Sequence, residues 1–431
     1  GIPAEPLFRS SYHNNHSMEY SKKAIVLGGT NPHIELIRQL HERGYYVILV
    51  DFLPHPPAKP YADLHVQEST MDMDKVVEIG KEYNVDLVIC SCIDQQNVSA
   101  CYAAEKLGLT RPYSYELAKN ITNKGYMKKI MVENNLPTTK YYYLSASDNI
   151  IELDLKFPVM VKPADSLGSA GVRKANTLEE LREYIEQARK FSRTKGCIVE
   201  EFFEGKEVSV YAFASDGKAS IVMISQRYSV VDGDNKVLKC YATVTPPVIS
   251  DEAMRRIQEA SDGVVKSFGL DNTPLHVQFL INGDDIDLIE FAPRVGGGIS
   301  YRVIKEQTGF DIISASIDSF LGKKVNQTYH KSDSVYSINL LYGNDGVFDH
   351  VSGMQELIDK GVVEGFHNHK DKGGEVSTEK ATASRIGAML IKGKNEEELL
   401  SKIHYAFEHI DAFDANGKSM LRKDLYLKEL V

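Results

Sequence analysis

The sequence lacks tryptophan entirely, and its 431 residues include only five cysteines. An odd and sparse set of cysteines argues against a disulfide framework and for a reducing compartment, so we expect a cytoplasmic protein. Cys90-Ser-Cys92 is a close pair, but the sequence around it lacks the further ligands that a zinc site needs. We therefore expect these two residues to be buried thiols at the end of a strand.

The sequence also lacks any apolar run near the roughly 18 residues that a bilayer-spanning helix needs, which excludes a transmembrane enzyme. A dense basic block is missing too. The 50 Lys and Arg residues oppose 60 Asp and Glu residues, and the net charge of −10 argues against a nucleic-acid partner. Residues 1–21 have no apolar core of a signal peptide, and we expect a disordered tail or a non-native remnant there.

What the sequence does contain is typical of a folded globule, with 42% hydrophobic and 26% charged residues. At roughly one to two hundred residues per domain, its length predicts two to four domains. The pattern of strands and helices predicts an N-terminal α/β domain at 22–118 and a central domain at 119–322. The central domain is expected to include a smaller α+β unit at about 136–206, and an α+β domain at 323–431 is expected to follow.

In the first domain, short apolar strands alternate with amphipathic helices, which predicts a parallel sheet covered by helices on both faces. The strand Ala24–Leu27 leads into Gly28-Gly29, and we expect Asn31 to cap the next helix with Pro32 at its first position. Gly28-Gly29 and Asp51 would suit a dinucleotide site. A tight strand-to-helix turn explains them better, because the later glycines of that fingerprint are missing. The carboxyl edge of the sheet is still expected to hold part of a substrate.

Two lysines stand where they could neutralise phosphate groups. Lys124 lies in a helix expected over about 119–135, and Lys162 leaves a buried strand for a Gly/Ser loop that contains Ser166, Gly168, Ser169 and Gly171. A lone lysine is usually a solvated surface residue, and such loops are common. Together, however, the two lysines and the loop amides would suit a triphosphate.

The stretch 199–208 combines acidic residues with two phenylalanines. We interpret it as an edge strand that breaks at Phe202-Phe203, where exposed main-chain groups could read the edge of an adenine. Glu207 follows the turn, where a carboxylate could accept hydrogen bonds from ribose hydroxyls. Taken alone, the stretch is better explained as an acidic hairpin with two core phenylalanines.

Residues 276–298 hold the most specific motif. Gln278 and Glu290 lie on strands that the Asn-Gly-Asp turn at 282–284 would make antiparallel neighbours, with both side chains on one face. Hard oxygen ligands on a rigid sheet suit Mg²⁺. Arg294 offers a planar fork for a phosphoryl group or an oxyanion, and Gly296–Gly298 add main-chain amides. This combination favours function over a purely structural role.

In this order and spacing, the motifs resemble those of the ATP-grasp superfamily over nearly the whole chain from Lys22. The chain looks most like the carboxylate–amine ligases of the L-amino acid ligase type. It is also similar to the ATP-grasp halves of the carbamoyl-phosphate synthetase large subunit and to purine-pathway enzymes. Asp94-Gln95-Gln96 resembles the family's N-terminal domain, and Ser384-Arg385-Ile386-Gly387 resembles the C-terminal domain of the amino acid ligase branch.

The resemblance implies an ATP-grasp fold, with a parallel α/β domain, a lid at about 136–206, a central α+β unit and a C-terminal α+β domain. It implies ATP and Mg²⁺ as cofactors, with Mn²⁺ as a substitute. The residues implied to bind ATP are Lys124, Lys162, Ser166, Gly168, Ser169, Gly171, Glu200, Glu201, Phe203 and Glu207. Gln278 and Glu290 would hold the metal, and Arg294 would act on the acyl phosphate and the tetrahedral intermediate.

Two departures from the family pattern concern the metal site. Gln278 stands where many relatives have a carboxylate, and an amide oxygen is a weaker ligand, so one metal would be held more loosely. Ala292 stands where many relatives have asparagine, and this form is similar to that of the L-amino acid ligases.

The leading interpretation is a ligase that joins a small carboxylic acid to an amine. The residues implied to meet these substrates are Arg227, His276, Gly297, Gly298 and Arg302. The resemblance also allows a homodimer. Two alternatives remain open, which are a bicarbonate-activating enzyme of the carboxylase or carbamoyl-phosphate-synthetase kind and a non-catalytic nucleotide-binding protein.

Overall fold

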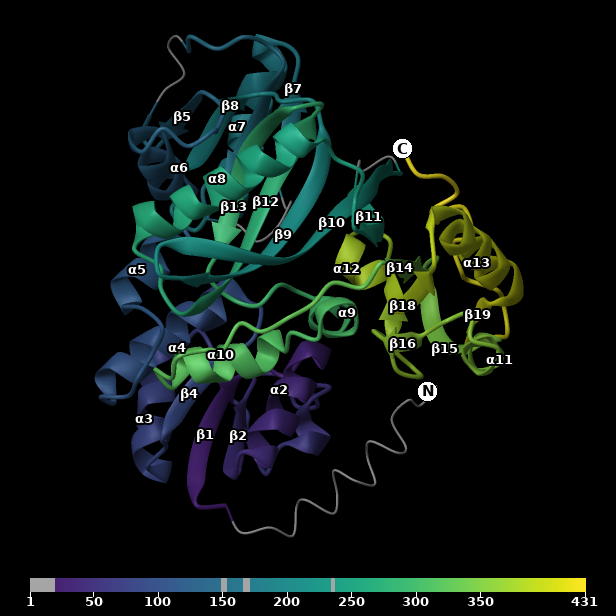
Figure 1. Ribbon diagram of the computed structural model, residues 1–431, viewed down its shortest axis with the longest axis horizontal. Coiled ribbons are helices and arrows are strands. Elements are labelled where there is room, and N and C mark those ends of the chain that lie inside the picture. Colours follow the sequence, from purple (N-terminus) through teal and green to yellow (C-terminus); the bar gives the residue numbers. More distant parts are fainter. Residues whose placement is uncertain (1–19, 149–152, 166–170, 234–236) are drawn as a thin grey trace.

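The computed structural model describes residues 20–148, 153–165, 171–233 and 237–431. Within these residues the strands form four sheets, one parallel and three antiparallel. Figure 1 shows the parallel sheet at the bottom of the molecule, a small sheet at the top, and a long central sheet that extends toward the C-terminal region on the right. The predicted mixture of α/β and α+β architecture is confirmed.

The parallel sheet has the strand order β3-β2-β1-β4. Its elements are β1 (Lys22–Leu27), α2 (Asn31–Glu42), β2 (Tyr45–Val50), the 3-10 helix η1 (Lys59–Tyr61), β3 (Leu64–Val66), α3 (Met73–Tyr83), β4 (Leu87–Cys90) and α4 (Asp94–Lys106). Thr30, and not Asn31 as predicted, occupies the cap position of α2. Asn31 is already helical, and its side chain instead donates a hydrogen bond of 2.7 Å to the carbonyl of Asn368.

The single helix predicted over 119–135 is wrong. The chain forms two helices there, α5 (Tyr115–Asn120) and α6 (Lys124–Glu133). The cause is Asn123, whose backbone is extended and whose side-chain oxygen accepts a hydrogen bond of 3.0 Å from the amide of Tyr126. This cap starts a new helix at Lys124 and so fixes where that lysine leaves the backbone.

The small sheet has the order β5-β8-β6-β7 and is covered by α7. Its elements are β5 (Tyr141–Leu144), β6 (Val159–Pro163), β7 (Arg173–Ala175), α7 (Leu178–Phe191) and β8 (Cys197–Glu201). The prediction of an edge strand before Phe202-Phe203 is wrong, because β8 pairs with β5 on one side and with β6 on the other. That pairing joins segments that are distant in sequence.

The central sheet has eight strands in the order β13-β12-β9-β10-β11-β14-β18-β16. Its strands are β9 (Lys206–Ser215), β10 (Lys218–Asp232), β11 (Val237–Thr245), β12 (Thr273–Asn282), β13 (Asp285–Ala292), β14 (Val335–Tyr342), β16 (Gly365–Asn368) and β18 (Arg385–Gly393). The associated helices are α8 (Asp251–Phe268), α9 (Ser300–Thr308) and α10 (Ile312–Phe320).

The two faces of the central sheet differ in character. Leu275, Val277 and Phe279 are buried in one core with residues of α8. Because side chains alternate along a strand, His276 and Gln278 point to the opposite face. The face of the central sheet that carries His276 and Gln278 is therefore not the one that packs on α8, and it can hold polar side chains.

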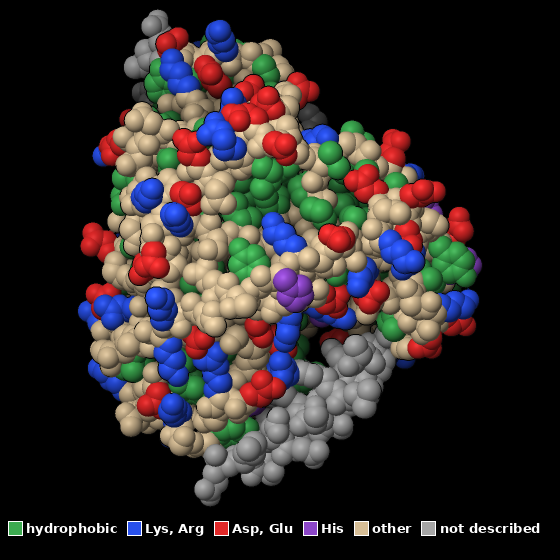
Figure 2. Space-filling model, in the orientation of Figure 1, with side chains coloured by type: hydrophobic (Ala, Val, Ile, Leu, Met, Phe, Trp, Pro, Cys, Tyr) green, Lys and Arg blue, Asp and Glu red, His purple; other side chains and the backbone are tan. Residues whose placement is uncertain are grey.

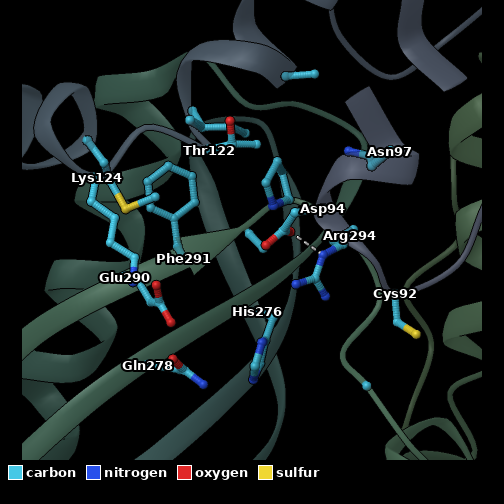
Figure 3. Close-up of a pocket in the computed structure, with 16 residues that line it drawn as sticks. Cys92, Asp94, Asn97, Thr122, Lys124, His276, Gln278, Glu290, Phe291 and Arg294 are labelled. Atoms are coloured by element: carbon cyan, nitrogen blue, oxygen red, sulfur yellow. Dashed lines mark hydrogen bonds and ion pairs between the residues drawn. The ribbon is translucent and has the colours of Figure 1, made fainter. Parts of the chain in front are cut away.

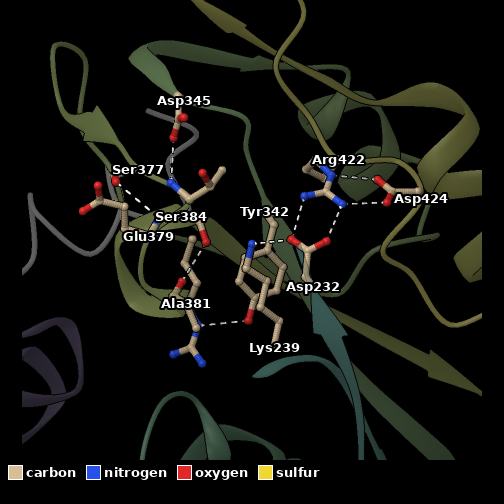
Figure 4. A network of polar contacts seen from close by, with 12 residues as sticks. Asp232, Lys239, Tyr342, Asp345, Ser377, Glu379, Ala381, Ser384, Arg422 and Asp424 are labelled. Atoms are coloured by element: carbon tan, nitrogen blue, oxygen red, sulfur yellow. Dashed lines mark hydrogen bonds and ion pairs between the residues drawn. The ribbon is translucent and has the colours of Figure 1, made fainter. Parts of the chain in front are cut away.

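A short sheet of order β17-β15-β19 completes the C-terminal region. Its elements are β15 (Gly346–Ser352), α11 (Met354–Asp359), β17 (Glu375–Val376), α12 (Ala381–Ser384), α13 (Glu396–His409) and β19 (Asp411–Asp414). Arg422 ties this region to the β10–β11 hairpin through hydrogen bonds of 2.9 and 3.0 Å to Asp232 (Figure 4). Lys239, almost fully buried, lies 2.8 Å from the same carboxylate.

All five cysteines are free, which agrees with the absence of a disulfide framework expected from the sequence. Cys90 is buried and Cys92 half-buried, and burial raises the pKa of both thiols. Among the described residues, no helix is long and apolar enough to cross a membrane. The space-filling view shows acidic and basic side chains interspersed over the visible face (Figure 2).

Candidate active site

A cavity of about 200 Å³ lies where the first domain meets β12 and β13 (Figure 3). Its lining includes six of the residues expected to bind ATP, metal or substrate or to act in catalysis, which are Lys124, His276, Gln278, Glu290, Arg294 and Gly297. Asp94, Cys92 and Asn97 line it from the first domain. Distant stretches of the chain therefore converge on one space.

Gln278 and Glu290 are direct partners in the antiparallel pairing of β12 with β13. The predicted neighbourhood of these two residues is confirmed. The hairpin turns at Gly283, which has a φ of +61° that a glycine adopts without strain. Figure 3 shows both side chains in the cavity, with Lys124 reaching toward Glu290 from α6. Two oxygen donors and one ammonium group thus face the same space.

Arg294 is held by a residue that sequence reasoning did not assign. Its Nε donates a hydrogen bond of 2.5 Å to Oδ1 of Asp94, and its Nη1 donates one of 3.0 Å to the carbonyl of Val295. Asp94 is the first residue of α4, so the ion pair joins the parallel sheet's region to the central sheet. The sequence analysis noted Asp94 only within Asp94-Gln95-Gln96, as a resemblance of the N-terminal domain, because an acidic residue after a buried strand is too common to be given a role of its own.

His276 lines this cavity and also a second cavity that adjoins it. Its ring stacks on Tyr211 at a centroid distance of 4.8 Å, and its buried Nε2 has no hydrogen-bond partner in the described part of the chain. Burial, followed by the charges of Arg294 and Arg227, lowers the pKa of His276 to about 3. The imidazole is therefore neutral near pH 7, and its Nε2 can form a hydrogen bond with a ligand without adding a charge.

Lys162 belongs to a buried network of charges on the small sheet. Its Nζ forms an ion pair with Oε1 of Glu200, while Nζ of Lys128 lies 2.7 Å from Oε2 of the same carboxylate. Burial raises the pKa of Glu200, but the two lysines outweigh it and hold that pKa at about 2. The side chain of Glu200 thus positions lysines. Lys128 was not predicted, although it follows Lys124 by one turn of α6.

This network reaches the strand that carries Glu290. Thr139 donates from its hydroxyl to Oε2 of Glu200 and from its amide to Oδ1 of Asp287, each over 3.1 Å. Burial acts to lower the pKa of Lys162, but Glu200, then Glu290 and Asp287, raise it overall. Lys162 and Glu290 therefore share one electrostatic environment, although Lys162 does not line the cavity itself.

Not all of the other residues implied to bind ATP are among the described residues. Ser166, Gly168 and Ser169 lie outside the described residues, and Gly171 follows them with a φ of +74°. Glu201 ends β8, and Phe203 lies half-buried in the connection to β9. Glu207, on β9, lies 3.6 Å from Nε of Arg227.

A second cavity, of about 250 Å³, adjoins the first, and both are lined by His276 and Gly297. Arg227 and Gly298, two further residues implied to meet substrates, line this second cavity. Arg302 lines neither cavity. It lies on α9, 3.5 Å from Glu306, and donates a hydrogen bond of 3.2 Å to the carbonyl of Glu364.

Comparison with known proteins agrees with this arrangement. Residues 155–302 match the family model of the ATP-grasp domain. The carbamoyl phosphate synthase large chain of Thermoanaerobacter sp. is 25% identical over 225 residues, which is 51% of this chain and 20% of the relative. The formate-dependent phosphoribosylglycinamide formyltransferase of Ignicoccus hospitalis is 26% identical over 255 residues, 58% of this chain and 63% of that protein. The chain thus spans about a fifth of the first relative's length.

Solved structures match over much more of the chain. The L-amino acid ligase from Bacillus licheniformis superposes with a TM-score of 0.76 at 19% identity and covers 93% of this chain and 100% of its own. The phosphoribosylglycinamide synthetase from Anaerococcus prevotii superposes with a TM-score of 0.72 at 17% identity, covering 91% and 99%. The resemblance inferred from the motifs is confirmed: residues 155–302 match the ATP-grasp domain, and the chain has the fold of these solved structures.

Proposed function

We propose that the protein is an ATP- and Mg²⁺-dependent ligase that joins a carboxylate to an amine through an acyl phosphate and releases ADP and phosphate. The observation that carries the proposal is the convergence of Lys124, Gln278, Glu290 and Arg294 on one cavity. Two cations and two oxygen donors in one space suit a metal-bound triphosphate next to a second anion.

The nucleotide would lie between the small sheet and β12–β13. Lys124 and Lys162 would neutralise its phosphates, Ser166, Gly168, Ser169 and Gly171 would contribute to binding them, and Glu207 would accept hydrogen bonds from the ribose. Main-chain groups of Glu201 to Phe203 would meet the adenine, while the side chain of Glu200 would keep Lys162 in place. Related structures support a nucleotide here, because an N5-carboxyaminoimidazole ribonucleotide synthetase was solved as an ADP complex and a biotin carboxylase domain with MgADP.

The donor set of Glu290 and Gln278 fits Mg²⁺. No group of three or more His, Cys, Asp or Glu side chains in the described residues could hold a metal ion, so protein ligands alone make no complete site. Mg²⁺ commonly keeps waters and takes its remaining ligands from nucleotide phosphates, and two protein oxygens are enough for that. The ion would draw negative charge from the transferring phosphoryl group.

The residues then act by position and charge. A carboxylate oxygen of the substrate bonds to the terminal phosphorus as the bond to ADP breaks. The amine nitrogen then bonds to the acyl carbon as phosphate leaves. Arg294, oriented by Asp94, would stabilise the charge that develops on the acyl oxygens. His276 is too weak a base to take the amine's proton, given its pKa of about 3, so the proton would pass to phosphate or be lost before binding.

We propose that the enzyme has the three domains expected from the sequence, which are an N-terminal domain at 22–118, a central domain at 119–322 and a C-terminal domain at 323–431. The unit at about 136–206, which contains the small sheet, would serve as the lid that keeps water from the acyl phosphate. The central sheet continues across residue 323, because β14 and β18 pair within it.

A bicarbonate-activating reaction is the second candidate, favoured by the match to carbamoyl phosphate synthase. A phosphate-release screen with Mg-ATP separates the two. Release that depends on particular acid and amine pairs supports the ligase, and release that depends on bicarbonate alone supports the alternative. Tight MgATP binding without turnover for any pair would overturn both and leave a nucleotide-binding protein.

A further inference from the structure

The second cavity has a charge pattern unlike that of the first. Among its described lining residues are Arg227 and Arg385, and no aspartate or glutamate is present. Hydroxyl groups also line it, and they belong to Ser209, Tyr211, Ser225, Thr243, Thr245, Ser300 and Tyr336. The hydroxyls of Thr245 and Ser300 already donate to backbone carbonyls, so the other five remain as possible donors. His369 contributes no charge, because burial, followed by the charges of Arg385 and Lys370, lowers its pKa to about 4. The lining is therefore cationic and rich in donors.

This cavity lies on the same sheet face as the metal ligands. Residues that are direct partners in antiparallel strands share a face. Gln278 pairs with Ser209, and Ser209 pairs with Ser225, two positions before Arg227 on β10. From there the face continues across β11 and β14, where Thr243 pairs with Ile338. The next strand is β18, whose Arg385 is the partner of Tyr342 on β14.

Among the described residues, the guanidinium of Arg385 has one hydrogen-bond partner, and its other N–H groups have none. Its Nε donates to the hydroxyl of Tyr342 over 3.3 Å, and that hydroxyl in turn donates to the carbonyl of Cys240 over 2.7 Å (Figure 4 labels Tyr342). Among the described residues, the guanidinium forms no ion pair with a carboxylate. The tyrosine thus orients the arginine without neutralising it.

Arg227 is also poorly neutralised. Its closest described carboxylate is that of Glu207, which lies 3.6 Å away and beyond hydrogen-bonding distance. The Nε atom of Arg227 is buried and has no hydrogen-bond partner in the described part of the chain. The Arg227 side chain as a whole is 32% exposed, so a ligand can reach its guanidinium and supply the hydrogen-bonded anion that the described protein groups do not.

We propose that Arg227 and Arg385 bind a negatively charged group of one substrate, a carboxylate or a phosphate that does not itself react. The inference rests on the proposed function, since the reacting carboxylate is assigned to the first cavity. About 250 Å³ is less than the roughly 300–1,000 Å³ of drug-sized sites, so the substrate is small. Ile299, Val303 and Ile338 leave an apolar wall for its carbon chain. The two arginines are then specificity-determining residues.

Matched substrates test the inference in turnover. Phosphate release is measured with L-alanine, with alaninamide, which lacks the carboxylate, and with aminoethyl phosphate as acceptors, each against a set of small acids with and without a second carboxylate. For the preferred anionic substrate, Arg385→Met and Arg227→Met should raise KM roughly ten- to hundredfold. Values of kcat and of KM for ATP should change little. Arg385→Lys should restore part of the affinity.

Arg255→Met is the matched control, because Arg255 is an exposed arginine on α8 that pairs with Glu252 and Glu259. This variant should change neither kcat nor the KM for the anionic substrate. A purely structural role of Arg385 would raise KM for anionic and neutral substrates alike and lower the unfolding temperature. That outcome would overturn the inference. It would also be overturned if the wild-type protein used alaninamide and L-alanine equally and, in addition, used acids with and without a second carboxylate equally.

Direct binding separates this inference from the ligase proposal. Isothermal titration with succinate and with aminoethyl phosphate, in the presence of MgADP, reports anion binding without any turnover. Binding that Arg385→Met abolishes and Arg255→Met preserves supports the inference, and the tighter probe shows whether carboxylate or phosphate is preferred. Binding that is absent, or equal in all variants, overturns it even if the enzyme ligates acids to amines.

Discussion

The two adjoining cavities lie on one sheet but differ in how their cationic side chains are paired. In the first, Arg294 is paired with Asp94, and Lys124 points toward Glu290. In the second, Arg227 and Arg385 have no hydrogen-bonded carboxylate among the described residues. Paired charges hold a geometry before any ligand arrives, as chemistry requires. Charges without a hydrogen-bonded anion instead favour the binding of a ligand that supplies one, as selectivity requires. The predictions below test this contrast, from the largest expected effect to the smallest.

The largest effect is expected from the paired groups of the first cavity. Glu290→Ala and Arg294→Ala should each lower kcat by at least about 10²–10³, because they remove a metal ligand and the cation that faces developing charge. Phosphate release under saturating ATP measures the loss, and circular dichroism checks that the fold persists. Normal turnover in both variants would falsify these roles.

The next effect concerns the lysine network beside that cavity. Lys128→Met removes one of the two cations bonded to buried Glu200, which should cost about 3 kcal/mol in the free energy of unfolding. Denaturant unfolding measures it. Lys129→Met, on the same helix, is the control because Lys129 is exposed and 4.0 Å from Glu133. Equal stability of the two variants would show that the buried pair contributes nothing.

A pH effect of somewhat smaller size is expected at Asp287. Burial, the largest cause, raises the pKa of Asp287 to about 6. The folded state therefore binds a proton that the unfolded state has already lost between about pH 4 and 6. Stability from this residue is full below about pH 4 and falls, by on the order of 2 kcal/mol, as the pH rises through 6. The difference in unfolding free energy between wild type and Asp287→Asn, measured across this range, should show that fall. A flat difference would contradict it.

The smallest effect should come from Asp94. In Asp94→Asn, an amide oxygen can still accept from Nε of Arg294, but the negative charge is lost. We expect kcat to fall about tenfold with little change in KM for ATP. Asp74→Asn, on α3 and outside both cavities, is a matched control. A loss as large as that of Arg294→Ala would mean that Asp94 contacts substrate itself.

Local signals explain what could be predicted from sequence. The pairing of Gln278 with Glu290 follows from two short strands and one glycine turn, all within a few residues. The parallel sheet likewise follows from the alternation of strands and helices. The break in the helix at Asn123 was also local, but apolar spacing on both sides concealed the cap.

Long-range packing explains what could not. The position of β8 inside its sheet depends on β5, which lies more than fifty residues earlier. Asp94 meets Arg294 across 200 residues, and Glu200 meets two lysines from other elements. Arg385 reaches the second cavity only because β18 joins the central sheet through β14. No spacing within the sequence encodes these encounters.

The contact of Asp94 with Arg294 has a consequence for protein engineering. Exchanging the central portion between homologues would separate the arginine from the helix that orients it, unless the donor of the graft also supplies α4. Chimaeras cut at residue 119 should therefore fold yet work poorly when the two parents differ at position 94. Boundaries chosen to keep both residues from one parent should preserve rate.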